Sequence, residues 1–354
     1  MNLHIEKHAG ESAYLQLYRQ LRQEVVSGRL PCGSRLPSKR FLARELGLSV
    51  ITVEHAYDLL TDEGYAVSRP RSGIYVSFGG LSAQPAPRAA LEDMSAALEG
   101  AEDFPFSLWA RTMRGVLAEY DRRILVKSPN MGVWELRQAL AEYLGRSRGV
   151  SVRPEQLVIG SGAEYLYVLV AQLLGRERVF ALEEPCYEKI RRVYELEGVR
   201  CQGLPLTDDG IDPEALRRCR AGLLHVTPYH SYPSGVTASA ARRHEYAAWA
   251  EERDAVIVED DYDSALAAAG RQIETVLSIA PERVIYLSSF SKLLAPSMRT
   301  GFLVLPESLL ELYEERLGFA SCTVPVFDQL VLARFIRDGH MERYINRRRR
   351  KDAR

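Results

Sequence analysis

Residues 288–301 read SSFSKLLAPSMRTG, and this stretch decides how most of the chain is interpreted. It lies between the apolar runs 284–287 and 302–305, so the pattern predicts a loop between two buried strands. The loop holds Lys292 among serines, with Arg299 seven residues later. A lysine in a mostly apolar setting at a strand end loses its proton easily and can attack a carbonyl carbon. Hydroxyls beside a guanidinium suit a phosphate group. The alternative is an ordinary loop lysine without a chemical role.

Upstream, residues 256–263 read VIVEDDYD, a β-branched strand that ends in carboxylates and a phenol. In an open α/β sheet, ligand-binding groups lie at the carboxyl ends of strands, and a pyridoxal cofactor needs a carboxylate against its ring nitrogen. The two stretches together predict a pocket for pyridoxal 5'-phosphate (PLP) attached to Lys292. Because side chains alternate along a strand, we expect Asp260 at the ring nitrogen, Tyr262 near the ring hydroxyl and Asp261 on the opposite face. A solvated acidic loop is the alternative.

The run from residue 104 to residue 350 resembles the fold-type I aminotransferases, whose lysine motif is similar to Ser289-Phe290-Ser291-Lys292. Residues 259–264, which read EDDYDS, are more similar still to the MocR branch of the GntR regulators. Those proteins join a winged helix to an aminotransferase-like domain. The resemblance therefore implies an α/β protein with an N-terminal winged helix-turn-helix, followed by a fold-type I PLP-dependent transferase-like large domain.

The composition is that of an ordinary globular protein of 354 residues, long enough for two domains, with 46% hydrophobic and 26% charged residues. A net charge of −1 argues against a general polyanion binder, so any nucleic-acid surface must be local. No apolar run approaches the roughly 20 residues of a membrane span, and no secretory leader is visible, so we expect neither. The five cysteines are scattered without metal-ligand spacing, which indicates reduced thiols in a cytoplasm and no metal site.

Residues 1–78 carry the pattern of a helix-turn-helix followed by a wing. Apolar residues at helical spacing predict a helix over 12–27, and Ser38 and Ser49 are placed to cap two further helices that are separated by Gly47. In the first of these two helices we expect Phe41 to face inward with two leucines. Two strands, 65–67 and 73–76, flank the basic segment 69–72. Helical periodicity alone leaves open a three-helix fold without a DNA role.

The segment LPSKR at 36–40 matches the GntR entry to the second helix, and this resemblance favours DNA binding. Arginine is usual in that family where this chain has Val50, and occurs where it has Glu54. Ten Lys and Arg against eight Asp and Glu leave residues 1–78 a net charge of about +2, so we expect affinity to depend on dimerisation. The DNA-contacting residues that the resemblance implies are Ser38, Lys39, Arg40, Thr52, His55, Arg69 and Arg71.

A Gly- and Pro-rich linker is predicted over 79–103, and helix-like and strand-like segments alternate over 104–354. The segment GSGAE at 160–164 lies between a predicted strand, 156–159, and a predicted helix, 165–174, where backbone amides can face an anion. The resemblance implies that this loop holds the PLP phosphate through the backbone of Gly162, Ala163 and Glu164. It assigns Ser289, Ser291 and Arg299 to the same cofactor.

Three further positions are interpreted through the resemblance. Tyr187 stands where the family stacks an aromatic ring on the cofactor; a packed core tyrosine is the alternative. His230 stands near the expected ring hydroxyl, and an exposed histidine in a proline-rich loop is the alternative. Lys127 replaces a tyrosine that usually reaches the phosphate of the partner subunit, which weakens the expected dimeric site.

Residues 339–350 resemble the long helix that leads into a small C-terminal subdomain of the family, and the chain ends four residues later. The resemblance implies that the missing subdomain carries the arginine that grips a substrate carboxylate. We therefore expect PLP binding without sustained turnover of amino acids. A basic nucleic-acid tail is the other interpretation of this arginine-rich end.

The leading interpretation is a cytoplasmic PLP-responsive regulator that binds double-stranded operator DNA as a homodimer and senses PLP or an amino compound. The alternatives are a PLP-dependent aminotransferase and a DNA-binding scaffold whose second domain only dimerises. The N-terminal module has no purpose in an aminotransferase. The sequence specifies neither the effector nor the operator, nor whether binding activates or represses.

Overall fold

The computed structural model describes residues 3, 5, 12–69, 72–77, 104–266 and 274–352. The chain divides into two units, Met1–Glu99 and Gly100–Arg354. The predicted linker over 79–103 and the wing residue Arg71 lie outside the described residues. Within the described ranges, no helix is both long and apolar enough to cross a bilayer.

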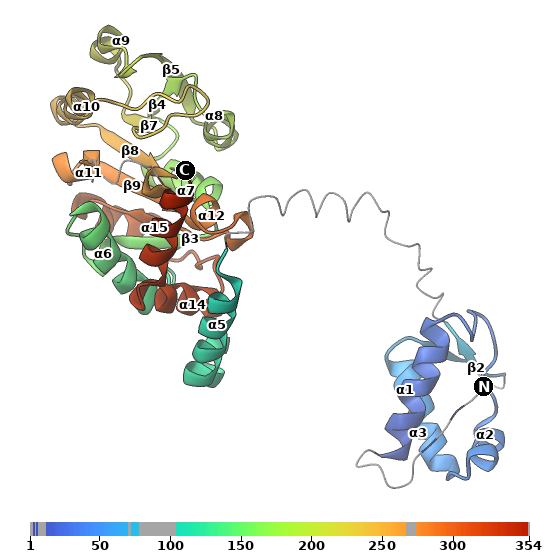
Figure 1. Ribbon diagram of the computed structural model, residues 1–354. Helices are drawn as coiled ribbons and strands as arrows, with labels where there is room; N and C mark the ends of the chain where they lie inside the picture. Colours follow the sequence, from blue (N-terminus) through green and yellow to red (C-terminus); the bar gives the residue numbers. More distant parts are fainter. Residues whose placement is uncertain are drawn as a thin grey trace. The chain divides into compact units, whose positions relative to one another are not determined.

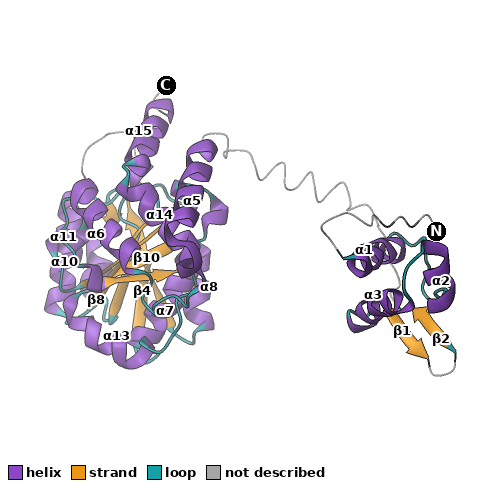
Figure 2. Ribbon diagram, turned by 90° about the horizontal axis from the view of Figure 1, so that it is seen from below, coloured by secondary structure: helices purple, strands orange, loops and turns teal. Residues whose placement is uncertain are grey.

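The described residues of the N-terminal unit form three helices and a two-stranded wing (Figure 2). Its core is formed by apolar side chains from all three helices, among them Leu17, Leu21, Val53 and Tyr57. Strands β1 and β2 pair antiparallel. The elements are α1 (Ala13–Val26), α2 (Lys39–Leu46), α3 (Val50–Asp62), β1 (Ala66–Arg69) and β2 (Gly73–Val76).

The turn between α2 and α3 follows from local chemistry. Ser38 and Ser49 accept hydrogen bonds from the backbone amides of the first turns of α2 and α3, as predicted. Gly47 ends α2 in the left-handed conformation at φ 62°, which costs glycine little. The predicted burial of Phe41 is wrong: its side chain is exposed and lies under Arg44, while Ala43 is buried in its place.

The second unit is built on an eight-stranded sheet in the order β3-β10-β9-β8-β7-β4-β5-β6. Strands β9, β8, β7, β4 and β5 run parallel, whereas β10 is antiparallel to both β3 and β9 and β6 is antiparallel to β5. The strands are β3 (Leu157–Gly160), β4 (Val179–Glu184), β5 (Arg200–Thr207), β6 (Gly210–Ile211), β7 (Leu223–Val226), β8 (Val256–Asp261), β9 (Val284–Ser289) and β10 (Gly301–Val304).

Helices cover both faces of this sheet, so its central strands are buried along their whole length (Figure 1). One face packs on α7 (Ala163–Leu174), α8 (Glu188–Leu196) and α13 (Leu310–Leu317). The other face packs on α5 (Phe106–Tyr120), α6 (Trp134–Arg148), α10 (Ala240–Glu252), α11 (Val276–Ile279), α14 (Val326–Arg337) and α15 (His340–Asp352). A short helix, α9 (Pro213–Arg218), follows β6.

The segment between β9 and β10 is not the plain loop that the sequence predicts. It contains the one-turn helix α12 (Phe290–Leu293) and a 3-10 turn over Pro296–Met298. Phe290 and Leu293 are buried on the core side of α12, and this pattern anchors the turn. Lys292 therefore projects from a short helix that is fixed by its neighbours.

Candidate functional site

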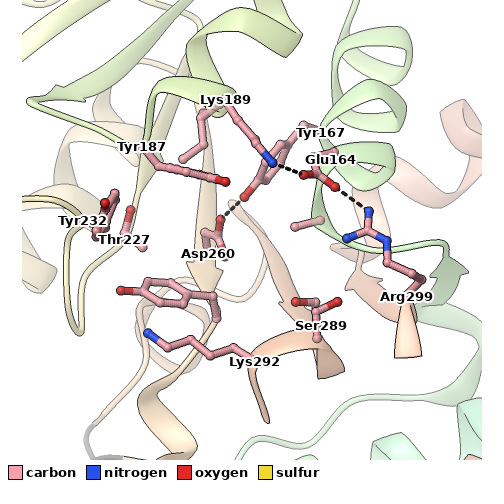
Figure 3. A pocket seen from close by; sticks show the side chains of 14 residues that line it. Glu164, Tyr167, Tyr187, Lys189, Thr227, Tyr232, Asp260, Ser289, Lys292 and Arg299 are labelled. Carbon is pink, nitrogen blue, oxygen red and sulfur yellow. Dashed lines mark hydrogen bonds and ion pairs between the residues drawn. The ribbon is translucent and has the colours of Figure 1, made fainter. Parts of the chain in front are cut away.

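A cavity of about 490 Å³ opens where the carboxyl ends of β8 and β9 meet the N-terminus of α7 (Figure 3). This is the edge at which open α/β sheets bind ligands. The cavity combines titratable groups, hydroxyls and aromatic rings from five stretches of the chain, 163–167, 187–190, 227–232, 260–262 and 289–299. It is lined by Ala163, Glu164, Tyr167, Tyr187, Lys189, Ile190, Thr227, Tyr232, Asp260, Tyr262, Ser289, Ser291, Lys292 and Arg299.

Asp260 lies at the floor of the cavity with an acceptor to spare. Its carboxylate is buried, and the Tyr167 hydroxyl donates to Oδ2 at 2.5 Å. His225 Nε2 lies 3.7 Å from the same oxygen, while Tyr194 fixes the other ring nitrogen, Nδ1, at 2.8 Å. The second carboxylate oxygen, Oδ1, has no hydrogen-bond partner among the described residues. Because an unpaired buried acceptor is costly, this oxygen marks where a ligand donor belongs.

Asp261 points to the opposite face, as the strand alternation predicts. Its carboxylate pairs with Arg148 of α6 at 2.6 Å and accepts a hydrogen bond from the Tyr286 hydroxyl at 2.5 Å. The backbone amide of Ser264 donates to the other oxygen at 3.1 Å. This buried group holds the end of β8 against α6. Of the two adjacent carboxylates, Asp260 therefore faces the cavity and Asp261 makes a packing contact.

The setting of Lys292 differs from the apolar one that the sequence suggested. Its ammonium lies 2.9 Å from Asp263 Oδ2 and 4.6 Å from the centre of the Tyr262 ring. About half of the lysine side chain is exposed, so a ligand in the cavity can reach the amine. The side chain is held in place by an ion pair and a cation–π contact.

The far end of the cavity concentrates positive charge around one carboxylate. Arg299 and Lys189 both pair with Glu164, which lies in the first turn of α7 (Figure 3). These two cations lower the pKa of Glu164, Arg299 through the larger contribution. The hydroxyl of Ser291 lines the cavity and is buried without a partner among the described residues. Two cations beside a helix N-terminus are groups that can bind a phosphate, and the spare hydroxyl lines the same cavity.

Gly162 precedes α7 for a geometric reason. Its φ is +94°, and an added Cβ would lie 2.9 Å from Arg299 Nη2. The glycine therefore lets the guanidinium approach the start of α7. Its backbone N–H donates to the Gly160 carbonyl at 2.9 Å, so the predicted phosphate contact through this amide is not free in the structure.

Two aromatic rings border the mouth of the cavity. Tyr187 and Tyr232 meet edge to face at 5.8 Å between ring centres. Tyr187 is 36% exposed, so the alternative of a packed core tyrosine is wrong. The Tyr187 ring lines the same cavity as Asp260, with the Lys189 ammonium 5.8 Å from its centre, and an aromatic ring in such a cavity can stack on a planar ligand.

His230 does not line the cavity. Its ring is stacked on the Tyr262 ring with 6.3 Å between the ring centres. Its Nδ1 lies 2.9 Å from Asp263 Oδ2. The Tyr262 hydroxyl donates to the His230 carbonyl at 2.7 Å. With about half of its side chain exposed, His230 supports Tyr262 and Asp263 and fits the exposed-loop alternative for its position.

A further buried carboxylate, that of Glu259, contacts α11. Glu259 accepts from the amides of Val276 and Leu277 at 3.0 and 2.7 Å and from the Tyr229 hydroxyl. Burial raises the pKa of Glu259 to about 7 despite these donors. The group ties the loop after β7 to α11 and stands apart from the cavity lining.

In the N-terminal unit, some of the expected DNA-contacting side chains are exposed, whereas others already contact neighbouring residues. Arg40 is exposed in the first turn of α2, and Arg69 lies 4.7 Å above the Tyr75 ring at the start of the wing. Lys39 pairs with Glu54 at 2.6 Å. The Ser38 side chain is used as a helix cap.

On α3, the hydroxyl of Thr52 lies 2.8 Å from that of Ser49. His55 is exposed and rests edge-on against Tyr14, with 5.8 Å between ring centres. Both side chains lie on the exposed surface of the recognition helix or at its border. The assignment of these residues to DNA contacts stays a prediction, and Arg71 lies outside the described residues.

Sequence reasoning missed several cavity residues. Tyr167 lies one turn into α7 and faces β8, a position that helical spacing from Ala163 could have revealed. Thr227 and Tyr232 come from the loop after β7, whose path is set by Glu183: this buried carboxylate accepts from the Thr227 amide and the Ser231 hydroxyl. No local sequence pattern predicts these hydrogen bonds between Glu183 and the loop after β7.

Comparison with known proteins identifies both units. Residues 13–76 match the bacterial regulatory proteins of the gntR family, and residues 100–351 match the class I and II aminotransferases. The HTH-type transcriptional regulator YdeL of Bacillus subtilis is 34% identical over 351 residues, which cover 95% of this chain and 76% of that protein. The HTH-type pyridoxine biosynthesis transcriptional regulator PdxR of Corynebacterium glutamicum is 30% identical over 356 residues, 98% of this chain and 78% of that protein.

A solved structure gives the fold of the second unit. The α-aminoadipate aminotransferase of Thermus thermophilus, in complex with N-(5'-phosphopyridoxyl)-L-leucine, is 30% identical with a TM-score of 0.63; the match covers 70% of this chain and 64% of that chain. The predicted winged helix and fold-type I domain are confirmed by these matches.

The chemical groups that line the cavity fit PLP, the cofactor of the class I and II aminotransferases. The unpaired Oδ1 of Asp260 suits a ring N–H, and the unpaired Ser291 hydroxyl and Arg299, which both line the cavity, suit phosphate oxygens. Lys292 reaches the same space with a primary amine. Among the described residues, no group of three or more His, Cys, Asp or Glu side chains could hold a metal ion.

Proposed function

The chain belongs to the transcriptional regulators that join a gntR-family DNA-binding region to an aminotransferase class I and II domain, and on this premise we propose that it is a PLP-responsive regulator. The observation that carries the proposal is the cavity itself: an unpaired buried acceptor, an unpaired buried hydroxyl and a reachable lysine occur together. A domain that served only for dimerisation would gain nothing from leaving these polar groups unsatisfied.

Each residue has a definite role in the proposal. Lys292 attaches the cofactor, Asp260 accepts the ring N–H and Tyr262 approaches the ring hydroxyl. Ser289, Ser291, Arg299 and the amides of Ala163 and Glu164 hold the phosphate, and Tyr187 stacks on the ring. PLP supplies, when bound, an aldehyde that reacts with primary amines. Lys292 then competes with any free amine, which gives the domain a way to sense amino compounds.

The partners in this proposal are double-stranded operator DNA, a second copy of the chain and an amino-compound effector. A homodimer suits the modest charge of the N-terminal unit, because two recognition helices double the contacts with a palindromic site. Binding of operator DNA implies a cytoplasmic location.

The proposal is tested in two steps with the full chain. Borohydride reduction after addition of PLP, followed by peptide mapping, should label Lys292; Lys189, whose amine lines the same cavity, is the internal control. Selection from random DNA should then yield an enriched sequence whose affinity changes with PLP. Label on another lysine contradicts the assignment of the attachment site. An enriched sequence that is indifferent to PLP contradicts the regulatory role.

An aminotransferase activity is the second candidate, and the 30% identity to an aminotransferase structure favours it. Steady production of a keto acid from an amino acid over many turnovers would support this candidate. Stoichiometric reaction that stops after a single turnover would support the regulator.

A further inference from the structure

Two aliphatic side chains stand exposed at the start of the recognition helix. Val50 and Ile51 are the first two residues of α3, and they are 42% and 64% exposed. The residues of the same helix that are buried in the hydrophobic core are Val53, Ala56, Tyr57 and Leu60. Nothing in the packing of the described unit requires an aliphatic residue at positions 50 or 51.

The surroundings of this pair are polar and basic. One turn further along α3, Glu54 follows Val50 and His55 follows Ile51 on the same surface rows. Glu54 is held by Lys39 at 2.6 Å, so its negative charge is compensated. Arg40 is exposed in the first turn of the neighbouring helix. Two aliphatic side chains thus protrude from a surface whose charge suits the phosphates on either side of a DNA groove.

Helix-turn-helix proteins place the first residues of the recognition helix against base edges in the major groove. The apolar group offered there is the C5-methyl of thymine, because the other base edges present hydrogen-bond donors and acceptors. A valine or isoleucine cannot satisfy those polar edges. It gains by covering a methyl group and loses by desolvating a guanine or cytosine edge.

We infer that Val50 and Ile51 read thymine methyl groups and are specificity-determining residues of this protein. The inference rests on the proposed DNA-binding function and deepens it by naming the chemistry that is read. Each half-site should carry thymine at the one or two base pairs that face the start of α3. A protein partner at this patch is the competing occupant.

The test separates the methyl group from every other feature of the base. A site selected from random DNA with the full chain is resynthesised with deoxyuridine in place of each thymine in turn, which removes only the methyl. At the positions facing α3, affinity should fall about fourfold per methyl, the value expected for one buried CH₂ group. At other thymines it should stay unchanged.

Variants then assign the effect to these side chains. In V50A and I51A proteins the deoxyuridine penalty should fall, because an alanine methyl covers less of the thymine methyl than valine or isoleucine does. Both positions are exposed and alanine favours helix, so the variants should fold as the parent does. Val67→Ala is the matched control: Val67 is 40% exposed on the wing strand, and its loss should leave the penalty intact.

Three results would overturn the inference. The deoxyuridine sites could bind as well as the thymine sites, the penalty could persist unchanged in both alanine variants, or a protein could be captured through this patch while DNA preference stays fixed. Failure to enrich any DNA sequence is a different outcome: it contradicts the proposed function and removes the inference with it.

Discussion

The cofactor cavity and the recognition surface, by which we mean the exposed side of α2 and α3, differ in how their side chains are held. In the cavity, side chains already bind one another: Tyr167 holds Asp260, and Asp263 holds Lys292. On the surface of α2 and α3, by contrast, Arg40, Val50 and Ile51 are exposed to solvent. The cavity is therefore pre-organised for a ligand, whereas these exposed side chains of α2 and α3 are not fixed by a buried network.

The difference has an energetic consequence. Substitutions in an interlocked buried network couple to their neighbours, while substitutions at separated exposed positions add. Cavity variants should therefore show large effects that depend on context. Surface variants should show small ones that can be summed.

The largest effect should come from the two adjacent carboxylates at the end of β8. Asp261→Ala leaves Arg148 as an unpaired buried charge, so the free energy of unfolding should fall by about 3–5 kcal/mol. All three tryptophans, Trp109, Trp134 and Trp249, lie in the second unit, so urea unfolding followed by their fluorescence reports on that unit alone.

Asp260→Ala should instead weaken PLP binding by about 10- to 100-fold, the contribution of a charge-assisted hydrogen bond, with a smaller loss of stability. Titration of PLP into the folded variants measures this. Equal losses of PLP affinity in the Asp260 and Asp261 variants would show that both carboxylates serve the cavity.

A pH dependence of stability should follow from Glu259. Its pKa is about 7 in the folded protein against a usual 4.5, so between these pH values the folded state keeps a proton that the unfolded state has released. Stability contributed by this group is complete below about pH 4.5 and is lost as the pH rises through 7, a change on the order of 3 kcal/mol. Tryptophan-monitored unfolding at pH 5 and pH 8 should show it, and Glu259→Gln should flatten the difference. An identical slope in the variant would assign it to other groups.

A smaller effect should separate the phosphate end of the cavity from its ring end. Glu164 pairs with both cations that a phosphate would use, so Glu164→Gln should raise PLP affinity about fivefold. Pyridoxal, which lacks the phosphate, should bind the variant and the parent equally. A gain for both ligands, or for neither, would mean that Glu164 does not compete with the phosphate.

The smallest single effects belong to the recognition surface. Arg40→Ala and Arg69→Ala should each weaken binding to all DNA sequences alike and reduce the slope of log affinity against log salt by about 0.9. The double variant should lose the sum of the two effects. His55→Ala should change the preferred sequence; behaviour like the arginine variants would assign His55 to a phosphate contact.

The same contrast decides what could be predicted from sequence. The facing of Asp260 and Asp261 and the caps Ser38 and Ser49 were predictable, because each depends on strand alternation or on a local hydrogen bond. The ion pair between Lys292 and Asp263 was not, since the sequence does not specify how the segments after β8 and β9 meet. Phe41 was misassigned because helical spacing does not distinguish a core position from one at the edge of a small unit.

The most direct test of the account measures the affinity for a selected operator with and without PLP, in the parent protein and in the Lys292→Ala variant. The cavity and the DNA-binding region act as one regulator if PLP changes operator affinity in the parent and leaves the variant unaffected. Lys189→Ala, which removes the other amine of the cavity but keeps the attachment site, should retain a response at a higher PLP concentration. Operator affinity that is unchanged by PLP in the parent, or that responds equally in the Lys292→Ala variant, would contradict the account.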